Sequence, residues 1–582
     1  MGSSQYRKFL AVGFAALAIA LPGSGSGSSC RVLPGDVDWP KLQDWQDLNK
    51  TVDGRLIGVI PRESVCHDAP YNRYDAEACA ALQKRFDFPI LERMEVPGEF
   101  MDMSFKNYSC DAFAERSAPC DPGNHASYVI DVRDAEDIKA ALEFASSRNI
   151  RLVVKNTGHD YLGRSTGAGA LSLWTHHLKS TEFIPAYASS YYAGPAMKLG
   201  AGVQGFEAYI AANSTGHRIV SGSCPTVGIA GGYSQGGGHS ILSSSHGLGS
   251  DNVLEWEVVT VDGRHLVATP DNEHADLYWA LTGGGPGNYA IVLSMTARVH
   301  RDSIVGGGTL AFNDSQVGND RFWDAVGAFQ ALLPDFNDNG GNSFVYGLTA
   351  DSFSAWTVTM PGAGPDESAA LMKPFLDDLS QRGIEYQYKP HVSPNFLEHF
   401  SRALGPLPEG IIENSGFMAS RMIPRAVLTS PEANARVTVA LRDISGLPGY
   451  SVACQSLSVG RADQPHPANA ALPAWRDAAL LCLPKGSWDP RAPRGVMAQR
   501  QAEAVTAVQA VMDAASPGGG VYMNEVSYLL PGWKAAMYGD NYDALLGVKR
   551  KYDPESVLYV LDGVGSDAWV EGADKRLCRV GS

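Results

Sequence analysis

The chain has 582 residues, of which 44% are hydrophobic and 19% are charged, so it is suited to a folded protein of more than one domain. Its formal net charge of −16 argues against a nucleic acid or an anionic membrane surface as a partner, because both require a basic face on the protein.

Residues 1–27 predict a signal peptide. Arg7 and Lys8 precede an apolar run at 9–21 that is too short to span a bilayer, and small residues follow it. We therefore expect a secreted or secretory-pathway protein with no membrane contact after signal cleavage. Four N-glycosylation sequons agree with that route. They begin at Asn49, Asn107, Asn213 and Asn313.

Residues 28–120 contain five of the nine cysteines and have poor apolar periodicity. We interpret them as an irregular, disulfide-rich extension packed on the main body, and not as a separate small domain. Proximity makes Cys110 with Cys120 and Cys454 with Cys482 plausible disulfides. The odd total indicates one reactive or otherwise occupied thiol, and no CxxC metal spacing occurs. The pairing of the others stays open: Cys30, Cys66, Cys79 and Cys578.

Residues 121–303 predict an α+β domain in which short β and α elements lead into two loops. The expected strand at 151–155 leads to a loop with His159, and the expected strand at 217–220 leads to a loop with Cys224. The five elements are a strand at 128–132, a helix capped by Asp134, a strand at 151–155, a helix at 205–212 and a strand at 217–220.

The end of this domain continues the alternation of short elements. A hairpin is expected with its turn at Asp262-Gly263, followed by a helix at 276–281. A glycine-rich loop at 283–288 then precedes a strand. The glycines at 236–238 do not have the GxGxxG spacing that follows a strand and opens a helix, so a nicotinamide cofactor is not indicated.

The two loops are GHDYLGRS at 158–165 and GSCPTVGIAGG at 222–232. Glycine lets backbone amides approach a ligand closely, and successive amides form anion-binding concavities. One His and one Cys, each in such a loop, indicate a pair of nucleophiles in place of a metal site.

These two strings resemble the flavin-attachment segments of berberine-bridge-enzyme-like oxidases, which belong to the vanillyl-alcohol-oxidase (VAO) superfamily with a PCMH-type FAD-binding fold. The resemblance extends over residues 120–300 and 505–570, and the N-terminal string is similar to secreted fungal members. It implies that His159 bonds the flavin 8α-methyl carbon and that Cys224 bonds ring position 6. Cys224 would then be the occupied thiol.

The resemblance also implies a two-lobed FAD-binding domain at 121–303 and further cofactor-binding residues. The pyrophosphate of FAD is anionic, so backbone amides of glycine loops and a nearby cation suit it. Lys155 and the turn that follows it could supply both the cation and the amides. The loop at 283–288 resembles the third flavin-facing loop of the family. The remaining residues expected to bind FAD are Asn156, Thr157, Gly158, Asp160, Gly163, Arg164, Ser165, Pro225, Thr226, Gly228, Gly232, Gly237, His239 and Asn541.

Residues 304–504 are implied by the resemblance to be a substrate domain with a broad antiparallel sheet over the flavin. No motif in this segment identifies the substrate. The expected strands lie at 343–350, 355–360, 436–441 and 451–460, and a helix is expected at 367–379.

Residues 505–582 are expected to return to the FAD domain after a helix at 500–515. The segment 541–554 resembles the C-terminal signature of the family and reads as a helix stopped by Asp553-Pro554.

The string Tyr522-Met523-Asn524-Glu525 resembles the YxNY-like string that lies over the flavin in relatives. As a strand it would put Tyr522 and Asn524 on one face and turn Glu525 away. We expect Tyr522 or Glu525 to be the catalytic base, with Tyr522 preferred and Asn524 beside it. The alternative is a structural tyrosine with a satisfied hydroxyl. Glu525 departs from the second tyrosine of sugar-oxidising members, which puts a sugar substrate in doubt.

The resemblance implies an FAD-dependent oxidase, monomeric, that oxidises an alcohol or a secondary-metabolite intermediate. Hydride would pass to flavin N5, and O₂ would become hydrogen peroxide. Val227 stands where valine accompanies oxidases and leucine accompanies oxygen-poor dehydrogenases in plant relatives. Two alternatives remain: the same fold used for oxidative cyclisation or isomerisation, and a non-enzymatic secreted glycoprotein.

Overall fold

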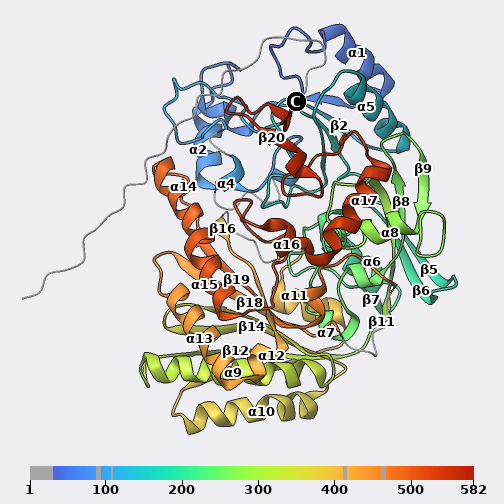
Figure 1. Cartoon of the computed structure of the whole chain (residues 1–582). Helices are drawn as coiled ribbons and strands as arrows, with labels where there is room; N and C mark the ends of the chain where they lie inside the picture. Colours follow the sequence, from blue (N-terminus) through green and yellow to red (C-terminus); the bar gives the residue numbers. More distant parts are fainter. Residues whose placement is uncertain (1–29, 87–92, 107–108, 411–415, 461–466, 582) are drawn as a thin grey trace, which may run out of the picture.

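The computed structural model describes residues 30–86, 93–106, 109–410, 416–460 and 467–581. They form an α+β structure with two larger groups of elements (Figure 1). In the upper group, α and β elements from both ends of the chain meet. The lower group is built on one broad antiparallel sheet. The predicted signal peptide, residues 1–27, and the sequon at Asn107 lie outside the described residues.

The first sheet has four strands in the order β1-β2-β4-β3, and β2, β4 and β3 are parallel. The Asp134 carboxylate caps the helix that follows β2, as predicted, by accepting bonds from the backbone N–H groups of Glu136 and Asp137. This helix packs on α1 through one core. The bounds are α1 Leu42–Thr51, β1 Leu56–Gly58, β2 Tyr128–Asp131, α5 Ala135–Ser147, β3 Leu152–Lys155 and β4 Leu171–Trp174.

The second sheet has five antiparallel strands in the order β5-β6-β10-β8-β9. The predicted hairpin is β8-β9, and Gly263 has φ +81° in its turn. The strand expected at 217–220 is only β7, His217–Arg218, which pairs with β11. Other bounds are β5 Thr181–Ala188, β6 Ala193–Gly200, α6 Gly205–Asn213, α7 Ser243–His246, β8 Val253–Val259, β9 His265–Ala268, α8 Ala275–Leu281, β10 Ile291–Arg298 and β11 His300–Arg301.

The broad sheet has eight antiparallel strands, in the order β15-β12-β14-β13-β18-β19-β16 with β17 on β19. One face packs on α9, α10 and α13 through an apolar core. The bounds are β12 Val305–Asn313, α9 Asn319–Asp338, β13 Ser343–Leu348, β14 Ser352–Pro361, α10 Pro365–Gln381, β15 Tyr386–Ser393, α11 Phe396–Leu404, β16 Gly416–Met418, β17 Arg421–Pro424, α12 Arg425–Thr429, α13 Pro431–Ser445, β18 Tyr450–Ser456 and β19 Ala478–Ser487.

The strand expected at 436–441 is wrong, because these residues lie inside α13. Ser430 caps the helix and Pro431 occupies its first turn, which are strong helix-start signals. The buried residues of α13 include Ala433, Val437 and Leu441, which share one helical face. The valines and threonine of the segment favour a strand locally, but this apolar spacing decides the structure.

The C-terminal segment returns to the upper group (red in Figure 1). The helix expected at 500–515 is part of a longer helical run, α14 Arg494–Glu503, a π-helical turn Ala504–Gln509 and α15 Ala510–Ala515. Helix α17, Tyr542–Tyr552, ends before Pro554 as predicted. Its buried Lys549 donates to the carbonyl oxygens of Asn288 and Leu558, which ties α17 to the glycine loop at 283–288.

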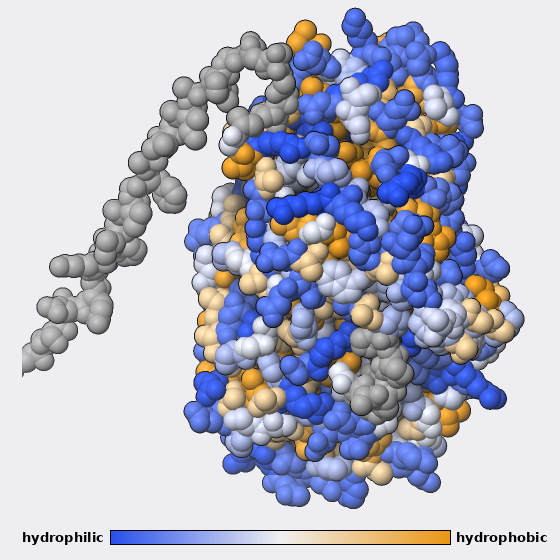
Figure 2. All heavy atoms as spheres, turned by 45° about the vertical axis from the view of Figure 1, so that its right-hand side comes forward, coloured by the Kyte–Doolittle hydropathy of each residue, from blue (hydrophilic) through white to orange (hydrophobic). Residues whose placement is uncertain are grey.

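Short elements complete the structure. Helices α2, Ala76–Lys84, and α4, Met103–Lys106, belong to the cysteine-rich N-terminal part. Helix α16, Trp533–Tyr538, precedes α17, and strands β20, Trp569–Glu571, and β21, Leu577–Arg579, form a final hairpin. Within the described residues, no helix combines the length and the apolar character that a bilayer crossing requires. Figure 2 shows hydrophilic side chains over most of the face that it draws.

Four disulfides use eight of the nine cysteines. The two predicted pairs, Cys110 with Cys120 and Cys454 with Cys482, are confirmed. The open pairings are Cys66 with Cys79 and Cys30 with Cys578. Cys224 is the cysteine outside the disulfides, as the odd count predicted.

Candidate active site

One pocket brings the two glycine loops together with the broad sheet. His159 lines it from the loop after β3, and Cys224 lines it from the loop after β7. Strands of the broad sheet also line it, together with Tyr522, Asn524 and Glu525. The fold therefore places both predicted nucleophiles and the predicted catalytic string around one space.

His159 and Cys224 both contact one hydroxyl group. The Nε2 atom of His159 lies 2.8 Å from Oγ1 of Thr226, and the same oxygen lies 3.6 Å from Sγ of Cys224. Thr226 is itself 1% exposed, and its carbonyl accepts a bond from Gln204. This buried threonine therefore fixes the position of the imidazole relative to the thiol.

The His159 loop is held by its own polar residues. The carboxylate of Asp160 accepts bonds from the backbone N–H of Leu162, at 2.9 Å, and from the N–H and hydroxyl of Ser165, at 2.7 and 2.9 Å. Gly158 lines the pocket with φ +88°, a region that favours glycine. Because Asp160 is used to shape the loop, its carboxylate has a structural role beside the pocket.

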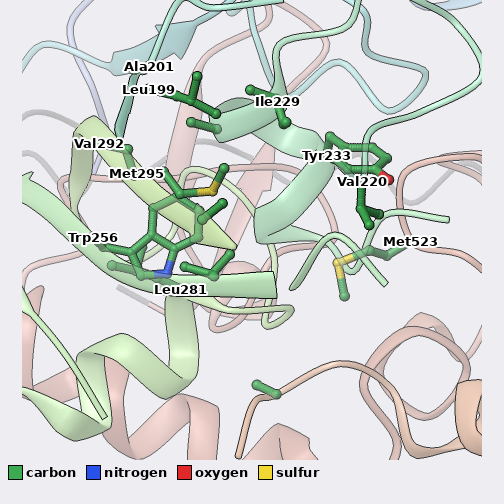
Figure 3. Close-up of a cluster of buried hydrophobic side chains, with 14 of the residues drawn as sticks. Leu199, Ala201, Val220, Ile229, Tyr233, Trp256, Leu281, Val292, Met295 and Met523 are labelled. Atoms are coloured by element: carbon green, nitrogen blue, oxygen red, sulfur yellow. The ribbon is translucent and has the colours of Figure 1, made fainter. Parts of the chain in front are cut away.

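The second loop approaches the first so closely that only glycine fits. A Cβ atom on Gly228 would lie 1.9 Å from Oδ1 of Asn156, and one on Gly231 would lie 2.9 Å from the same side chain. A π-helical turn, Ile229–Tyr233, follows. Figure 3 shows Ile229 and Tyr233 among buried apolar side chains, so the core anchors this loop behind the pocket.

Four residues that line the pocket each have a buried polar atom without a hydrogen-bond partner in the described part of the chain. The atoms are Oδ1 of Asn156, Nη1 of Arg164, Oγ of Ser223 and Oε1 of Gln235. Buried polar groups of native proteins are normally paired, so these atoms point to a polar ligand. Their mixture of donors and acceptors, with one guanidinium, fits a flavin nucleotide with its anionic phosphates.

The cation that lines the pocket is Arg164, and not Lys155 as predicted. The Lys155 ammonium donates to the carbonyl oxygens of Arg93, Met94 and Val96, and its side chain does not line the pocket. Burial lowers the pKa of Lys155 to about 7. Arg164 lines the pocket while its other nitrogens donate to the carbonyls of Leu561 and Asp562, so the C-terminal return holds this cation in place.

Five other expected cofactor residues also lie outside the pocket lining, each with a structural role: Thr226, described above, and four more. Gly163, at φ +71°, makes room for Phe105. The carbonyl of Pro225 accepts from Phe206. Gly237, at φ +112°, lies against Trp475, and Asn541 donates to the carbonyls of Ala470 and Ala471. The expected residues that do line it are Asn156, Thr157, Gly158, His159, Asp160, Arg164, Ser165, Cys224, Val227, Gly228, Gly232 and His239.

Residues 522–525 form a turn, so the expected strand is wrong. The backbone N–H of Glu525 donates to the carbonyl of Tyr522 at 3.0 Å, which closes the turn. The turn brings all the polar side chains of the string into the pocket, including Glu525, which alternation had turned away. The Asn524 amide donates to the Tyr522 hydroxyl at 2.9 Å, so the two residues lie side by side although they are not on a strand.

The carboxylate of Glu525 pairs with His239. His239 Nε2 lies 3.1 Å from Oε2 of Glu525, and its Nδ1 lies 2.7 Å from Oε1 of Gln455 on β18. In contrast, burial and the nearby charge of Glu525 raise the pKa of Tyr522 well above its usual value. The hydroxyl of Tyr522 is therefore held in its protonated form, which leaves no phenolate to accept the substrate proton.

Comparisons with known proteins agree with this geometry. The chain matches the model described as FAD binding domain over residues 126–269 and the berberine and berberine-like model over 521–565. It is 57% identical to the VAO-type flavoprotein oxidase VAO615 of Thermothelomyces thermophilus, over 98% of this chain and 99% of the relative. It is 44% identical to a bifunctional decalin synthase of Penicillium decumbens, over 95% and 96%.

The crystal structure of the VAO-type flavoprotein MtVAO615 from Myceliophthora thermophila C1 superposes with a TM-score of 0.92. It is 57% identical and covers 95% of this chain and 100% of that one. The similarity spans both groups of elements, so the relationship extends beyond the two loops. The chain therefore belongs to the VAO-type, berberine-bridge-enzyme-like family and is an FAD-linked oxidoreductase.

Proposed function

We propose that this enzyme is an oxidase whose FAD is attached through both His159 and Cys224. The observation that carries the proposal is their meeting at Thr226 in one pocket. A glucooligosaccharide oxidase from Acremonium strictum, which shares the fold at 20% identity and a TM-score of 0.62, has a 6-S-cysteinyl, 8α-N1-histidyl FAD.

The residues that would hold the cofactor are those with unpaired buried polar atoms. Arg164 would face the anionic phosphates, and Asn156, Ser223 and Gln235 would bond its polar atoms. When bound, FAD supplies the acceptor for a hydride from the substrate carbon and transfers the electrons to O₂, giving hydrogen peroxide. The glycines at 228 and 231 let the backbone come close to it.

Glu525 is the base in this proposal, in place of Tyr522. A substrate alcohol loses its hydroxyl proton to the Glu525 carboxylate while its carbon loses a hydride, so the product is a carbonyl compound. His239 holds the carboxylate and is itself held by Gln455, which defines the orientation of the pair. Asn524 and Tyr522 remain beside it as hydrogen-bonding groups for the substrate hydroxyl.

Oxidative cyclisation or isomerisation is the second candidate. The relative from Penicillium decumbens, named a bifunctional decalin synthase, favours it. The same base and acceptor can serve such a reaction. Peroxide release separates the candidates in part, because a net isomerisation consumes no O₂. The non-enzymatic alternative is not retained, since the relatives are named as oxidoreductases.

We also propose a secretory route for this protein. The four disulfides support it, because such bonds persist in oxidising compartments. N-terminal sequencing of the protein from its native source should begin near residue 28, and endoglycosidase should lower its mass. A mature protein that retains residues 1–27 would contradict this route.

Intact-mass measurement tests the attachment. The purified protein should be yellow and should keep its flavin after acid denaturation. His159→Ala and Cys224→Ala should each retain flavin through one bond, whereas the double variant should release it to acid. Flavin that stays bound to the double variant would overturn the assignment. A panel of alcohols read by peroxide release then identifies the substrate.

A further inference from the structure

Part of the pocket wall is one face of the broad sheet. The sheet packs its other face on α9, α10 and α13, so side chains alternate between that core and the pocket. On β13, Phe344 and Tyr346 join the core, whereas Val345 lines the pocket. Ala453, Leu481 and Leu483 continue this apolar wall on β18 and β19.

Trp356 lies at a β-bulge on the pocket face of β14. On β14, Thr357 is opposite Val345 of β13, but the next pair is Ala355 with Tyr346, so Trp356 has no partner there. The same irregularity occurs toward β12. Bulges re-aim side chains next to functional sites. Trp356 is 39% exposed while lining the pocket, although Ala355 and Thr357 are each 1% exposed.

A glycine makes room for the indole. A Cβ atom on Gly347 of β13 would lie 2.7 Å from Cζ2 of Trp356. The indole therefore crosses the neighbouring strand at a position without a side chain. This packing leaves part of the ring accessible from the pocket, in a fixed orientation.

The charged groups of the pocket lining belong to elements outside the broad sheet. Among the described residues that line the sheet wall, no side chain is charged, and Gln455 is already bonded to His239. Glu525 contacts His239, and the pair therefore lies beside Gln455 of β18. The hydroxyl groups of a sugar need paired donors and acceptors, which this apolar wall does not offer. An aromatic ring of a substrate would instead be stabilised by stacking on the indole of Trp356.

We propose that Trp356, with Val345, Leu481 and Leu483, forms a subsite for the planar, aromatic or conjugated body of an uncharged substrate. The hydroxyl to be oxidised then lies beside Glu525. Trp356 is a specificity residue in this assignment, and the substrate class is an apolar, flat alcohol. The inference rests on the proposed oxidase function.

Binding to the holoenzyme tests the subsite. Under anaerobic conditions, calorimetry should be run with 2-naphthalenemethanol, cyclohexylmethanol and cellobiose as probes. We expect the naphthalene compound to bind about tenfold or more tightly than cyclohexylmethanol, and cellobiose to bind weakest. Trp356→Ala should remove the aromatic preference, and Trp356→Phe should keep part of it. Gly347→Ala should weaken naphthalene binding, because its methyl group displaces the indole.

Leu332→Ala is the control, since Leu332 is 40% exposed on α9 and lies outside the pocket lining. It should leave all three affinities unchanged. The inference is overturned if cellobiose binds most tightly, if no aromatic probe binds, or if Trp356→Ala and Trp356→Phe keep the full preference. Acid-stable flavin in every variant, measured by mass, would show that the proposed oxidase assignment survives such a failure. Loss of flavin from the unmutated protein would instead overturn that assignment.

Discussion

The hydroxyl of Thr226 lies 2.8 Å from Nε2 of His159 and so joins the histidine loop to the cysteine loop. A hydrogen bond at one ring nitrogen fixes the imidazole tautomer and orientation, which decides what the other nitrogen can do. Under the proposed attachment, Thr226 is therefore a positioning residue for the histidine, although it does not line the pocket.

Thr226→Val should slow covalent attachment by about fivefold, because one buried hydrogen bond contributes roughly 1 kcal/mol. Apo-protein mixed with FAD and sampled over time for intact mass would measure the rate. Thr226→Ser keeps the hydroxyl and should attach flavin at the normal rate. Equal rates for the Val and Ser variants would remove Thr226 from the attachment chemistry.

Glu525→Gln should lower the rate of flavin reduction by about 10²- to 10⁴-fold, the range expected for loss of a general base. Tyr522→Phe should change it by less than about tenfold, since the raised pKa of Tyr522 keeps its hydroxyl protonated. Anaerobic stopped-flow mixing with substrate measures both. The flavin content of each variant should be unchanged. If Tyr522→Phe is the slower variant, the base is the tyrosine.

Val227→Leu should slow reoxidation by O₂ and leave reduction by substrate intact. Val227 lines the pocket three residues after Cys224, so a longer side chain there occupies space beside the cofactor site. Stopped-flow traces of the reduced enzyme with oxygenated buffer measure the effect. Val227→Ala is the matched control and should keep fast reoxidation. Unchanged reoxidation in the leucine variant would assign Val227 to loop packing alone.

Asp562→Asn should stabilise the protein at alkaline pH. Burial raises the pKa of Asp562 from 3.8 to about 6, and its Oδ2 has no partner in the described part of the chain. The folded state binds the Asp562 proton more tightly than the unfolded state does. The free energy of unfolding therefore falls as the pH rises from about 3.8 to 6, and it stays lower at higher pH. Asparagine also tolerates the backbone φ of +53° at this position.

The variant should raise the free energy of unfolding by about 1–3 kcal/mol at pH 8 and by little at pH 3.5. Thermal unfolding at both values measures this difference. The exposed Asp540→Asn, in the same C-terminal segment, should show no such pH dependence. An equal gain for Asp562→Asn at the two pH values would contradict a proton-linked cause.

Local signals predicted the loops and the elements that lead into them. Asp134 caps its helix and Gly263 turns its hairpin because those residues act through their own backbone neighbourhood. His159 and Cys224, each in a glycine-rich loop that resembles a family segment, similarly located part of the pocket.

Local sequence signals do not predict the features that depend on tertiary contacts. Lys155 has the charge expected of a phosphate ligand, but carbonyls of Arg93, Met94 and Val96 surround its ammonium. The turn at Tyr522 is closed by a backbone hydrogen bond from Glu525, which the residue types of this string do not predict. The Trp356 bulge is visible only from strand register, since three strands must be aligned before the unpaired residue is apparent.

The disulfide between Cys30 and Cys578 turns almost the whole chain into a covalent ring, since the two residues are 548 positions apart. Any single proteolytic cut between them leaves both fragments attached, and they separate on a gel only after reduction. An enzyme that works outside the cell, among proteases, would thus keep its N-terminal helix and its C-terminal return on one molecule after a nick.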